Sequence, residues 1–257
     1  MEEKTKTIIE FDFQLIANFY KRFDRQGPGS KDVTLKALSF IDNLPHKPKI
    51  ADIGCGTGGQ TIYLAENTSA NIVAIDLMED FTTILNNKVK DLGFQDRISV
   101  INGSMDNLPF SDNELDLIWA EGSIYNVGYE KGLAEWRRLL KDDGYIAVSE
   151  ASWFTESRPA EIEKFWDINY PQIDTIPVKI QQMEKAGYVS VAHFILPEYC
   201  WLDEFFAPIE NGMNDFLADN NYSEAAKELI EYEKHEIALY KKYKQYYGYV
   251  FYIGKKI

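Results

Sequence analysis

The sequence predicts an α/β protein built on a doubly wound, mostly parallel sheet. Three observations carry this prediction. Short apolar runs alternate with helix-like segments between residues 49 and 148, a glycine-rich turn follows the first run, and the runs are mostly continuous in their hydrophobicity. Continuous apolar runs are typical of strands that are buried on both faces of a sheet. A chain of 257 residues is long enough for one large domain of this class.

The strands and helices follow from these runs and their periodicity. The predicted strands are residues 49–53, 71–76, 98–103, 115–120, 145–150, 188–196 and 247–254. The predicted helices are residues 8–23, 58–66, 79–92, 131–140 and 176–186, together with one that starts after Ser30 and carries Val33, Leu35, Leu38 and Ile41. Ser30 is expected to cap its helix, and Gly93 and Gly187 are expected to end two others.

A long helix-like stretch, residues 197–246, separates the last two predicted strands. Such an excursion between strands usually carries function rather than fold. Parallel pairing of the earlier strands implies right-handed crossovers.

Composition and charge exclude several classes of function. Asp and Glu total 41 against 27 Lys and Arg, so the net charge of −14 repels nucleic acid. No apolar stretch approaches the roughly 20 residues that a membrane-spanning helix needs, and the first ten residues lack the order of a signal peptide. Cys55 and Cys200 lie far apart, and the three histidines form no ligand-spaced cluster with them. We therefore expect a cytoplasmic protein without a metal.

The glycines of ADIGCGTGGQTIYLAEN, residues 51–67, can be read in two registers. Gly54, Gly56 and Gly59 match the G-x-G-x-x-G of dinucleotide sites, whereas Gly54, Gly56 and Gly58 match the tighter G-x-G-x-G of S-adenosylmethionine enzymes. Both registers give a strand, a turn and a helix whose N-terminal N–H groups point at a ligand.

Two carboxylates near this turn bear on the choice of ligand. Asp52 stands two residues before Gly54, where it is expected to face the ligand. A carboxylate ~5 Å from a diphosphate, at an effective dielectric of ~20, is repelled by roughly 3 kcal/mol, so Asp52 favours a cationic ligand without phosphate. Asp76 ends the second strand, where a carboxylate accepts both ribose hydroxyls. Asp76 is expected for NAD and for S-adenosylmethionine alike.

Five motifs in order resemble a known family: IADIGCGTGG, AIDL, GSMDNLPF, LDLIWAEGSIYNVG and LLKDDGYIAVSE. The chain is similar, over roughly residues 37–148, to class I S-adenosylmethionine-dependent methyltransferases. Within this family it resembles the small-molecule branch, similar to the ubiquinone and menaquinone biosynthesis (type 11) methyltransferases. The resemblance implies the Rossmann-like methyltransferase fold, with seven strands and the last one antiparallel between the fifth and sixth. It also implies S-adenosyl-L-methionine as cofactor.

The resemblance further implies a set of cofactor-binding residues. In such enzymes the loop 54–58 packs against the methionine moiety, the residue at Asp76 grips the ribose, and the residue at Leu77 covers the adenine. Those at Ser104 and Met105 lie beside the adenine ring, and the one at Glu121 lies where cofactor and substrate meet. The family often has Asp where Ser104 stands. The expected cofactor-binding set is Asp52, Gly54, Cys55, Gly56, Gly58, Asp76, Leu77, Ser104, Met105 and Glu121.

The expected organisation is a single methyltransferase domain over residues 1–257. It consists of an N-terminal helical lid (1–44), a cofactor-binding core (45–196), a helical insertion (197–246) and the last strand (247–257). Glu121 is the first candidate for a general base, because it follows a strand at its carboxyl end, and Tyr125 is a second catalytic candidate. Aromatic side chains near the expected pocket favour an apolar or a cationic acceptor.

The favoured function is methyl transfer from S-adenosylmethionine to a small-molecule acceptor. Two alternatives remain: a nicotinamide-dependent oxidoreductase that uses the longer glycine register, and a non-catalytic module that binds S-adenosylmethionine. The acceptor atom stays open among oxygen, nitrogen, carbon and sulfur.

Overall fold

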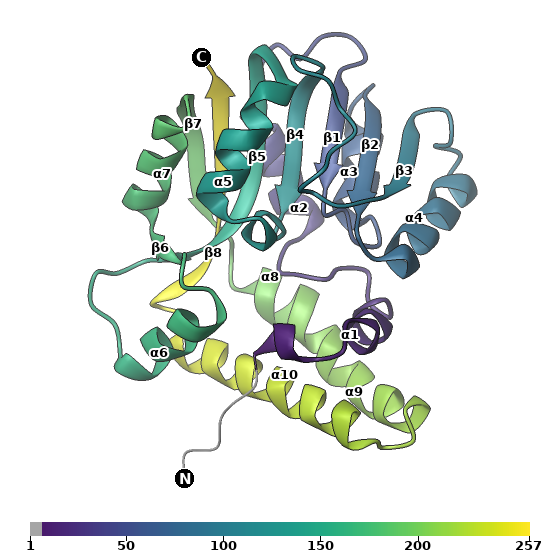
Figure 1. The fold of residues 1–257 in the computed structure, drawn as a ribbon, viewed down its shortest axis with the longest axis vertical. Helices are drawn as coiled ribbons and strands as arrows, with labels where there is room; N and C mark the ends of the chain where they lie inside the picture. The colour runs from purple at the N-terminus through teal and green to yellow at the C-terminus, as the bar shows by residue number, and fades with distance from the viewer. Residues whose placement is uncertain (1–6) are drawn as a thin grey trace.

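The computed structural model describes residues 7–257 and has one mixed sheet at its centre (Figure 1). The strand order is β3-β2-β1-β4-β5-β8-β7, with a short β6 paired to β5 outside this path. The strands are β1 (Lys49–Ile53), β2 (Asn71–Asp76), β3 (Ile98–Asn102), β4 (Leu115–Glu121), β5 (Leu140–Trp153), β6 (Asp174–Thr175), β7 (Tyr188–Ile195) and β8 (Tyr247–Lys256). Strands β1 to β5 pair in parallel, and β8 runs antiparallel between β5 and β7. The predicted fold class is confirmed, including the place of the antiparallel strand.

Helices cover both faces of the sheet. One face carries α2 (Lys31–Leu38), α3 (Gly59–Asn67) and α4 (Glu79–Asp91), whose apolar residues pack on alternate strand positions such as Ile50 and Ile72. The other face carries α5 (Tyr129–Trp136) and α7 (Ile176–Lys185), which pack on the positions between, such as Ala51 and Ile75. This alternation follows from the two-residue period of a strand.

A third layer of helices lies beyond the edge where the parallel strands end (Figure 1). It contains η1 (Ile8–Glu10), α1 (Phe13–Tyr20), α6 (Ala160–Asn169), α8 (Tyr199–Trp201), the π-helical turn η4 (Leu202–Phe206), α9 (Ala207–Asp219) and α10 (Glu224–Tyr243). These elements share an aromatic core of their own, in which Phe19, Phe216 and Tyr240 lie with Tyr247, the first residue of β8. The helix-like stretch 197–246 is therefore helical, and it packs against the N-terminal helix α1.

Local signals account for most helix ends. The Ser30 hydroxyl accepts a hydrogen bond from the Val33 N–H at 3.3 Å and caps α2, as predicted. Gly93 and Gly187 follow the ends of α4 and α7 with φ angles of +74° and +89°, which L side chains adopt at a cost. Within residues 7–257, no helix has the length and apolar character needed to span a membrane.

Three local predictions were wrong. The segment 8–23 is not one helix, because the Asp12 carboxylate accepts from the Leu15 N–H at 2.9 Å and starts α1 anew. The helix predicted to reach residue 140 ends at Trp136, passes through η3 (Arg137–Leu139), and Leu140 already belongs to β5. Helix α6 and strand β6 were not predicted at all. Ile162, Phe165 and Trp166 are all buried, and their spacing in the sequence is the pattern that could have predicted helix α6.

Candidate active site

The loop between β1 and α3 is shaped by three glycines in the left-handed region. Gly54, Gly56 and Gly58 have φ angles of +75°, +56° and +91°. A side chain at Gly54 would meet Ser123, one at Gly56 would meet Gln26, and one at Gly58 would meet Leu85. Gly59, in contrast, is the first residue of α3 and has no positive φ. The backbone therefore follows the tighter register, in which the third glycine is Gly58.

Asp76 ends β2 directly beside this loop. Its Oδ2 accepts a hydrogen bond from the Gly56 N–H at 2.9 Å, and its Oδ1 accepts one from the Met78 N–H at 2.9 Å. Burial raises the pKa of Asp76, while the hydrogen bonds from the Met78, Gly56 and Leu77 amides lower it. Each carboxylate oxygen keeps acceptor capacity for a further hydroxyl group.

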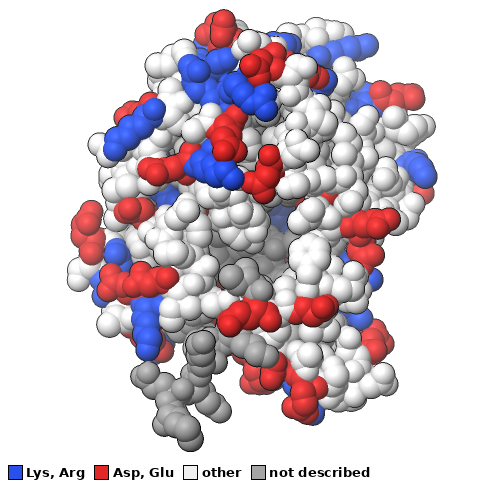
Figure 2. All heavy atoms as spheres, viewed as in Figure 1, with Lys and Arg blue, Asp and Glu red and all other residues white. Residues whose placement is uncertain are grey.

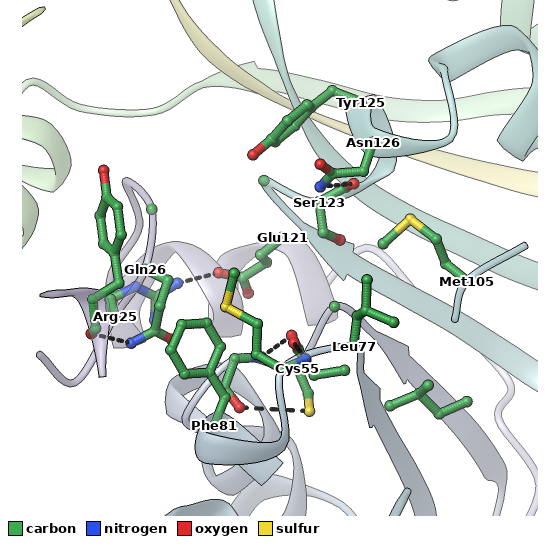
Figure 3. A pocket seen from close by; sticks show the side chains of 18 of the residues that line it. Arg25, Gln26, Cys55, Leu77, Phe81, Met105, Glu121, Ser123, Tyr125 and Asn126 are labelled. Carbon is green, nitrogen blue, oxygen red and sulfur yellow. Dashed lines mark hydrogen bonds and ion pairs between the residues drawn. The ribbon is translucent and has the colours of Figure 1, made fainter. Parts of the chain in front are cut away.

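A cavity of about 430 Å³ opens between the glycine loop, the ends of β2 and β4, and the N-terminal segment (Figure 3). Its wall brings together most of the predicted site residues: Gly54, Cys55, Gly56, Asp76, Leu77, Ser104, Met105, Glu121 and Tyr125. These residues come from the ends of four parallel strands, β1 to β4, and the loops that follow, where ligands bind in open α/β sheets. The molecular face in Figure 2 is hollowed near its centre, with acidic side chains beside the hollow.

Asp52 and Gly58 lie outside this wall. Asp52 is fully buried, and its carboxylate accepts from the Thr61 hydroxyl at 2.6 Å and from the Gln60 amide at 3.2 Å. Residues two apart on a strand share a face, so Asp52 points with Ile50 under α3 and not toward the ligand. The expectation that Asp52 faces the ligand is corrected accordingly, because its carboxylate fixes α3 to β1. Gly58 acts through the backbone turn that it permits.

Glu121 is held by three donors. Its Oε1 accepts from the Thr34 hydroxyl at 2.6 Å and the Trp119 indole N–H at 3.0 Å, and its Oε2 pairs with the Arg25 guanidinium. Figure 3 shows the Arg25 and Glu121 side chains directed toward each other. A carboxylate with both oxygens engaged is poorly placed to take a proton from a substrate. These contacts argue against a general-base role for Glu121, which stays a prediction that the pH profile of turnover tests.

The N-terminal segment supplies part of the wall that the sequence did not reveal. Phe13 and Ile16 of α1 line the cavity, and Gln26 clamps the glycine loop. The Thr57 N–H donates to Gln26 Oε1 at 2.9 Å, while Gln26 Nε2 donates to the Thr57 hydroxyl at 3.2 Å. The sequence of this segment, QGPGS over residues 26–30, marks a break in the helical pattern and gives no sign of these contacts. Tyr20 of α1 also lines the cavity.

Three further predicted residues, Ser104, Met105 and Tyr125, lie in loops at the cavity wall. The Ser104 hydroxyl accepts from the Asp106 N–H at 3.2 Å, which fixes the turn after β3. Asp106 also lines the cavity and pairs with Lys131 at 3.0 Å. Tyr125, in η2 (Ile124–Asn126), is 42% exposed, and its ring lies edge-on to that of Tyr170. Within residues 7–257, no group of three or more His, Cys, Asp or Glu side chains is arranged to hold a metal.

Comparison with known proteins agrees with this geometry. Residues 50–144 match the family model described as a methyltransferase domain. The middle part of the chain is thus similar to a methyltransferase domain. The matched segment runs from β1 to the start of β5 and contains the glycine loop, Asp76 and Glu121. The resemblance predicted from the five motifs is thereby confirmed.

Curated relatives of the chain are methyltransferases by name. The methyltransferase GfsG of Streptomyces halstedii is 28% identical over 147 residues, which cover 54% of this chain and 52% of the relative. The demethylmenaquinone methyltransferase of Bacillus subtilis (strain 168) is 32% identical over 125 residues, or 48% of this chain and 52% of that protein. The match thus spans about half the length of either relative.

The fold extends beyond the matched segment. A solved methyltransferase structure from Geobacter sulfurreducens, in complex with S-adenosyl-L-homocysteine, superposes with a TM-score of 0.83. It covers 96% of this chain and 99% of the other at 18% identity. At this identity the likeness establishes the fold alone, including the helical layer across the strand ends.

Proposed function

We propose that the protein is an S-adenosylmethionine-dependent methyltransferase that acts on a small-molecule acceptor. The observation that carries the proposal is the position of Asp76. Its carboxylate is oriented by the Gly56 and Met78 N–H groups, next to a loop of three left-handed glycines, and faces a cavity large enough for a nucleoside. The matched family model and the names of the relatives support the same reaction class.

The charges on the wall support this cofactor over a dinucleotide. Asp76, Asp106 and Glu121 line the cavity, and Arg25 is the one Lys or Arg among its described lining residues. Glu121 already neutralises Arg25, so a dianionic diphosphate would meet a net negative wall. The acids of the cavity wall, and not Asp52, therefore disfavour a diphosphate.

Arg25 offers a place for the carboxylate of the methionine moiety. Its Nε and Nη1 are buried without a hydrogen-bond partner in the described structure, although Nη2 is bound to Glu121. Buried guanidinium nitrogens are rarely left without an acceptor, so a carboxylate bound beside the glycine loop could accept a hydrogen bond from Nε or from Nη1. A zwitterionic amino-acid group beside the glycine loop fits Arg25 and the surrounding acids together.

The remaining residues are assigned by their place in the wall. We assign Gly54, Cys55 and Gly56 to the methionine moiety, Asp76 to the ribose hydroxyls, and Leu77, Ser104 and Met105 to the adenine.

When bound, S-adenosylmethionine supplies an electrophilic methyl group. The side chains of Phe13, Ile16 and Tyr20 would then exclude water and hold the acceptor in line, which lowers the barrier through positioning. Tyr125 is assigned to the side of the cavity where the acceptor enters.

The proposal extends to organisation and location. We infer that residues 1–257 act as one domain, in which the N-terminal segment closes the site and residues 197–246 form its outer wall. The two cysteines, Cys55 and Cys200, are both buried and free, which fits a reducing compartment such as the cytoplasm.

A methyl-transfer screen tests the function. The protein is incubated with a metabolite extract and S-adenosylmethionine that carries an isotopically labelled methyl group, and labelled products are identified by mass. The proposal predicts at least one product with the added labelled methyl group, formed in smaller amount by Asp76→Ala protein at limiting S-adenosylmethionine. If S-adenosylhomocysteine binds but no product forms with a broad extract, the protein is a binding module. If NAD instead of S-adenosylhomocysteine raises the melting temperature, it is an oxidoreductase.

A further inference from the structure

A second, smaller cavity lies against the proposed cofactor cavity and is lined mainly by aromatic rings. Its volume is about 120 Å³, and nine of its fifteen described lining residues are Phe, Tyr or Trp. Five residues line both cavities: Ile8, Tyr20, Gln26, Pro28 and Tyr125. The two spaces therefore adjoin each other across the N-terminal segment.

The rings of this aromatic chamber hold one another in place. Tyr20 of α1 stacks on Phe205 of η4 with ring centroids 6.4 Å apart. Tyr125 and Tyr170 meet edge to face at 6.0 Å. Trp201 and Tyr249 do the same at 5.0 Å. Because these contacts join five different parts of the chain, the chamber is a preformed space lined by ring faces and edges.

One charged side chain enters the chamber. Glu236 of α10 lines it, and no Lys or Arg is among its described lining residues. Neither a hydrogen bond nor an ion pair is found for the Glu236 carboxylate within residues 7–257. Burial raises the pKa of Glu236, which means that a carboxylate at this position lacks a compensating cation.

The charges around the chamber do not compensate Glu236. Glu233, one helical turn earlier, is fully buried, and its Oε1 accepts from the Tyr20 hydroxyl at 2.8 Å, while its Oε2 has no hydrogen-bond partner in the described structure. The ammonium of Lys179 lies behind Tyr170 at 3.4 Å from its hydroxyl, but it is already paired with Glu150 at 3.5 Å. The chamber thus combines aromatic faces with the Glu236 carboxyl group, which no Lys or Arg among the described lining residues compensates.

We propose that the aromatic chamber binds an organic cation, an alkylammonium group of the methyl acceptor. Aromatic faces attract such cations through their quadrupole, and a nearby carboxylate adds to the attraction. A protonated or quaternary nitrogen has no lone pair and cannot accept a methyl group. The charged nitrogen therefore serves recognition, and the methyl group goes to a different atom or to the amine after it has lost its proton. That the ligand is an acceptor rests on the proposed function, whereas the binding of the cation does not.

A pair of probes of equal shape tests this proposal. Choline and its uncharged carbon analogue 3,3-dimethyl-1-butanol are titrated into the full-length protein, each with and without S-adenosylhomocysteine, and binding is followed by ligand-observed NMR. Choline is expected to bind about tenfold more tightly than the alcohol, as cation–π and carboxylate contacts imply. Equal affinity for both probes would mean an apolar pocket, and absence of choline binding at millimolar concentration would also overturn the proposal.

Two matched variants locate the cation. Glu236→Gln keeps the shape of the side chain and is expected to lower choline affinity at least fivefold, while the alcohol binds as before. Glu231→Gln is the control, because Glu231 is an exposed residue of the same helix, paired with Lys234. Unchanged choline affinity in Glu236→Gln would contradict the proposal. Affinity for S-adenosylhomocysteine is measured in parallel: its absence in wild type refutes the proposed function and leaves the result with choline unaffected.

Discussion

The Arg25 guanidinium and the Glu121 carboxylate form an ion pair that joins the N-terminal segment to the end of strand β4. Both side chains are nearly buried, with exposed fractions of 9% and 3%. The two residues are 96 positions apart in the sequence, and both line the cavity. Their pair therefore holds the N-terminal segment against the cavity wall. Thr34 and Trp119 hold the other carboxylate oxygen, which fixes Glu121 between three elements.

Removal of Arg25 is expected to destabilise the protein strongly. Arg25→Ala leaves the Glu121 carboxylate buried without its cation, and breaking such a pair costs about 3–5 kcal/mol. The change is measured as the free energy of unfolding in urea. The control is Arg138→Ala, because the pair of Arg138 with Asp112 is exposed and is expected to contribute at most about 1 kcal/mol. Similar losses in the two variants would show that the buried pair has no special role.

The pH profile of turnover tests whether Glu121 acts as a base. Glu121→Gln is expected to lower stability and turnover, because Arg25 loses its anionic partner. The shape of the turnover profile against pH should stay the same, since the carboxylate is engaged by three donors and takes no proton from the substrate. Loss of an acidic limb from that profile in the variant would restore the base assignment.

The glycine register gives a further prediction. Gly58→Ala places a Cβ against Leu85 at a φ of +91°, so we expect a loss of about 2–4 kcal/mol from left-handed strain and overpacking. Gly59→Ala puts the same methyl group on the first residue of α3 without left-handed strain, but 3.2 Å from the Asp24 carbonyl oxygen, so its effect should be smaller, about 1–2 kcal/mol. Thermal unfolding of both variants measures this difference. A larger loss for Gly59→Ala would favour the dinucleotide register.

The buried Asp52 should make stability depend on pH. Burial raises the pKa of Asp52 to about 7, against about 3.9 in an unfolded chain. Between these values the native state holds a proton that the unfolded state has released, so stability falls as the pH rises. The loss is at most about 1.4 kcal/mol per pH unit and is complete above pH about 7.

Asp52→Asn isolates this contribution. The amide keeps partners in Thr61 and Gln60 but cannot titrate. The free energy of unfolding, measured between pH 5 and pH 8, should fall less with pH in the variant than in wild type. Other buried acids, such as Glu150, contribute equally to both proteins and cancel in the comparison. Parallel curves for the two proteins would contradict the raised pKa.

The sheet could be predicted from sequence because its signal is local. Apolar runs, the glycine loop and the strand-end Asp76 each depend on a few neighbouring residues, and β1, β2 and the antiparallel β8 appear where they were expected. The sequence also predicts that side chains alternate between the two faces of β1, which places Asp52 on the same face as Ile50, under α3. Neglect of that alternation led to the wrong expectation for Asp52.

The rest of the site depends on contacts between distant segments. Arg25 and Gln26 reach the ends of β4 and β1 only through the packing of α1 on the helical layer. Their sequence context, a glycine- and proline-rich break, predicts a turn but not its partners. The same holds for Glu236, which shares the aromatic chamber with Tyr20 across more than two hundred residues. Periodicity marks such residues as helical and says nothing of the space that they enclose.

Binding of S-adenosylhomocysteine to wild-type and Asp76→Ala protein, measured by titration calorimetry, tests the central claim most directly. The account predicts one site per chain in wild type and a loss of about 1.5–3 kcal/mol in the variant, as expected for a charge-assisted hydrogen bond to the ribose. Asp112→Ala, which alters an exposed acid that is not among the described lining residues of the cavity, should bind like wild type. Folded wild-type protein that binds no S-adenosylhomocysteine, or an Asp76→Ala variant that binds it unchanged, would contradict the account.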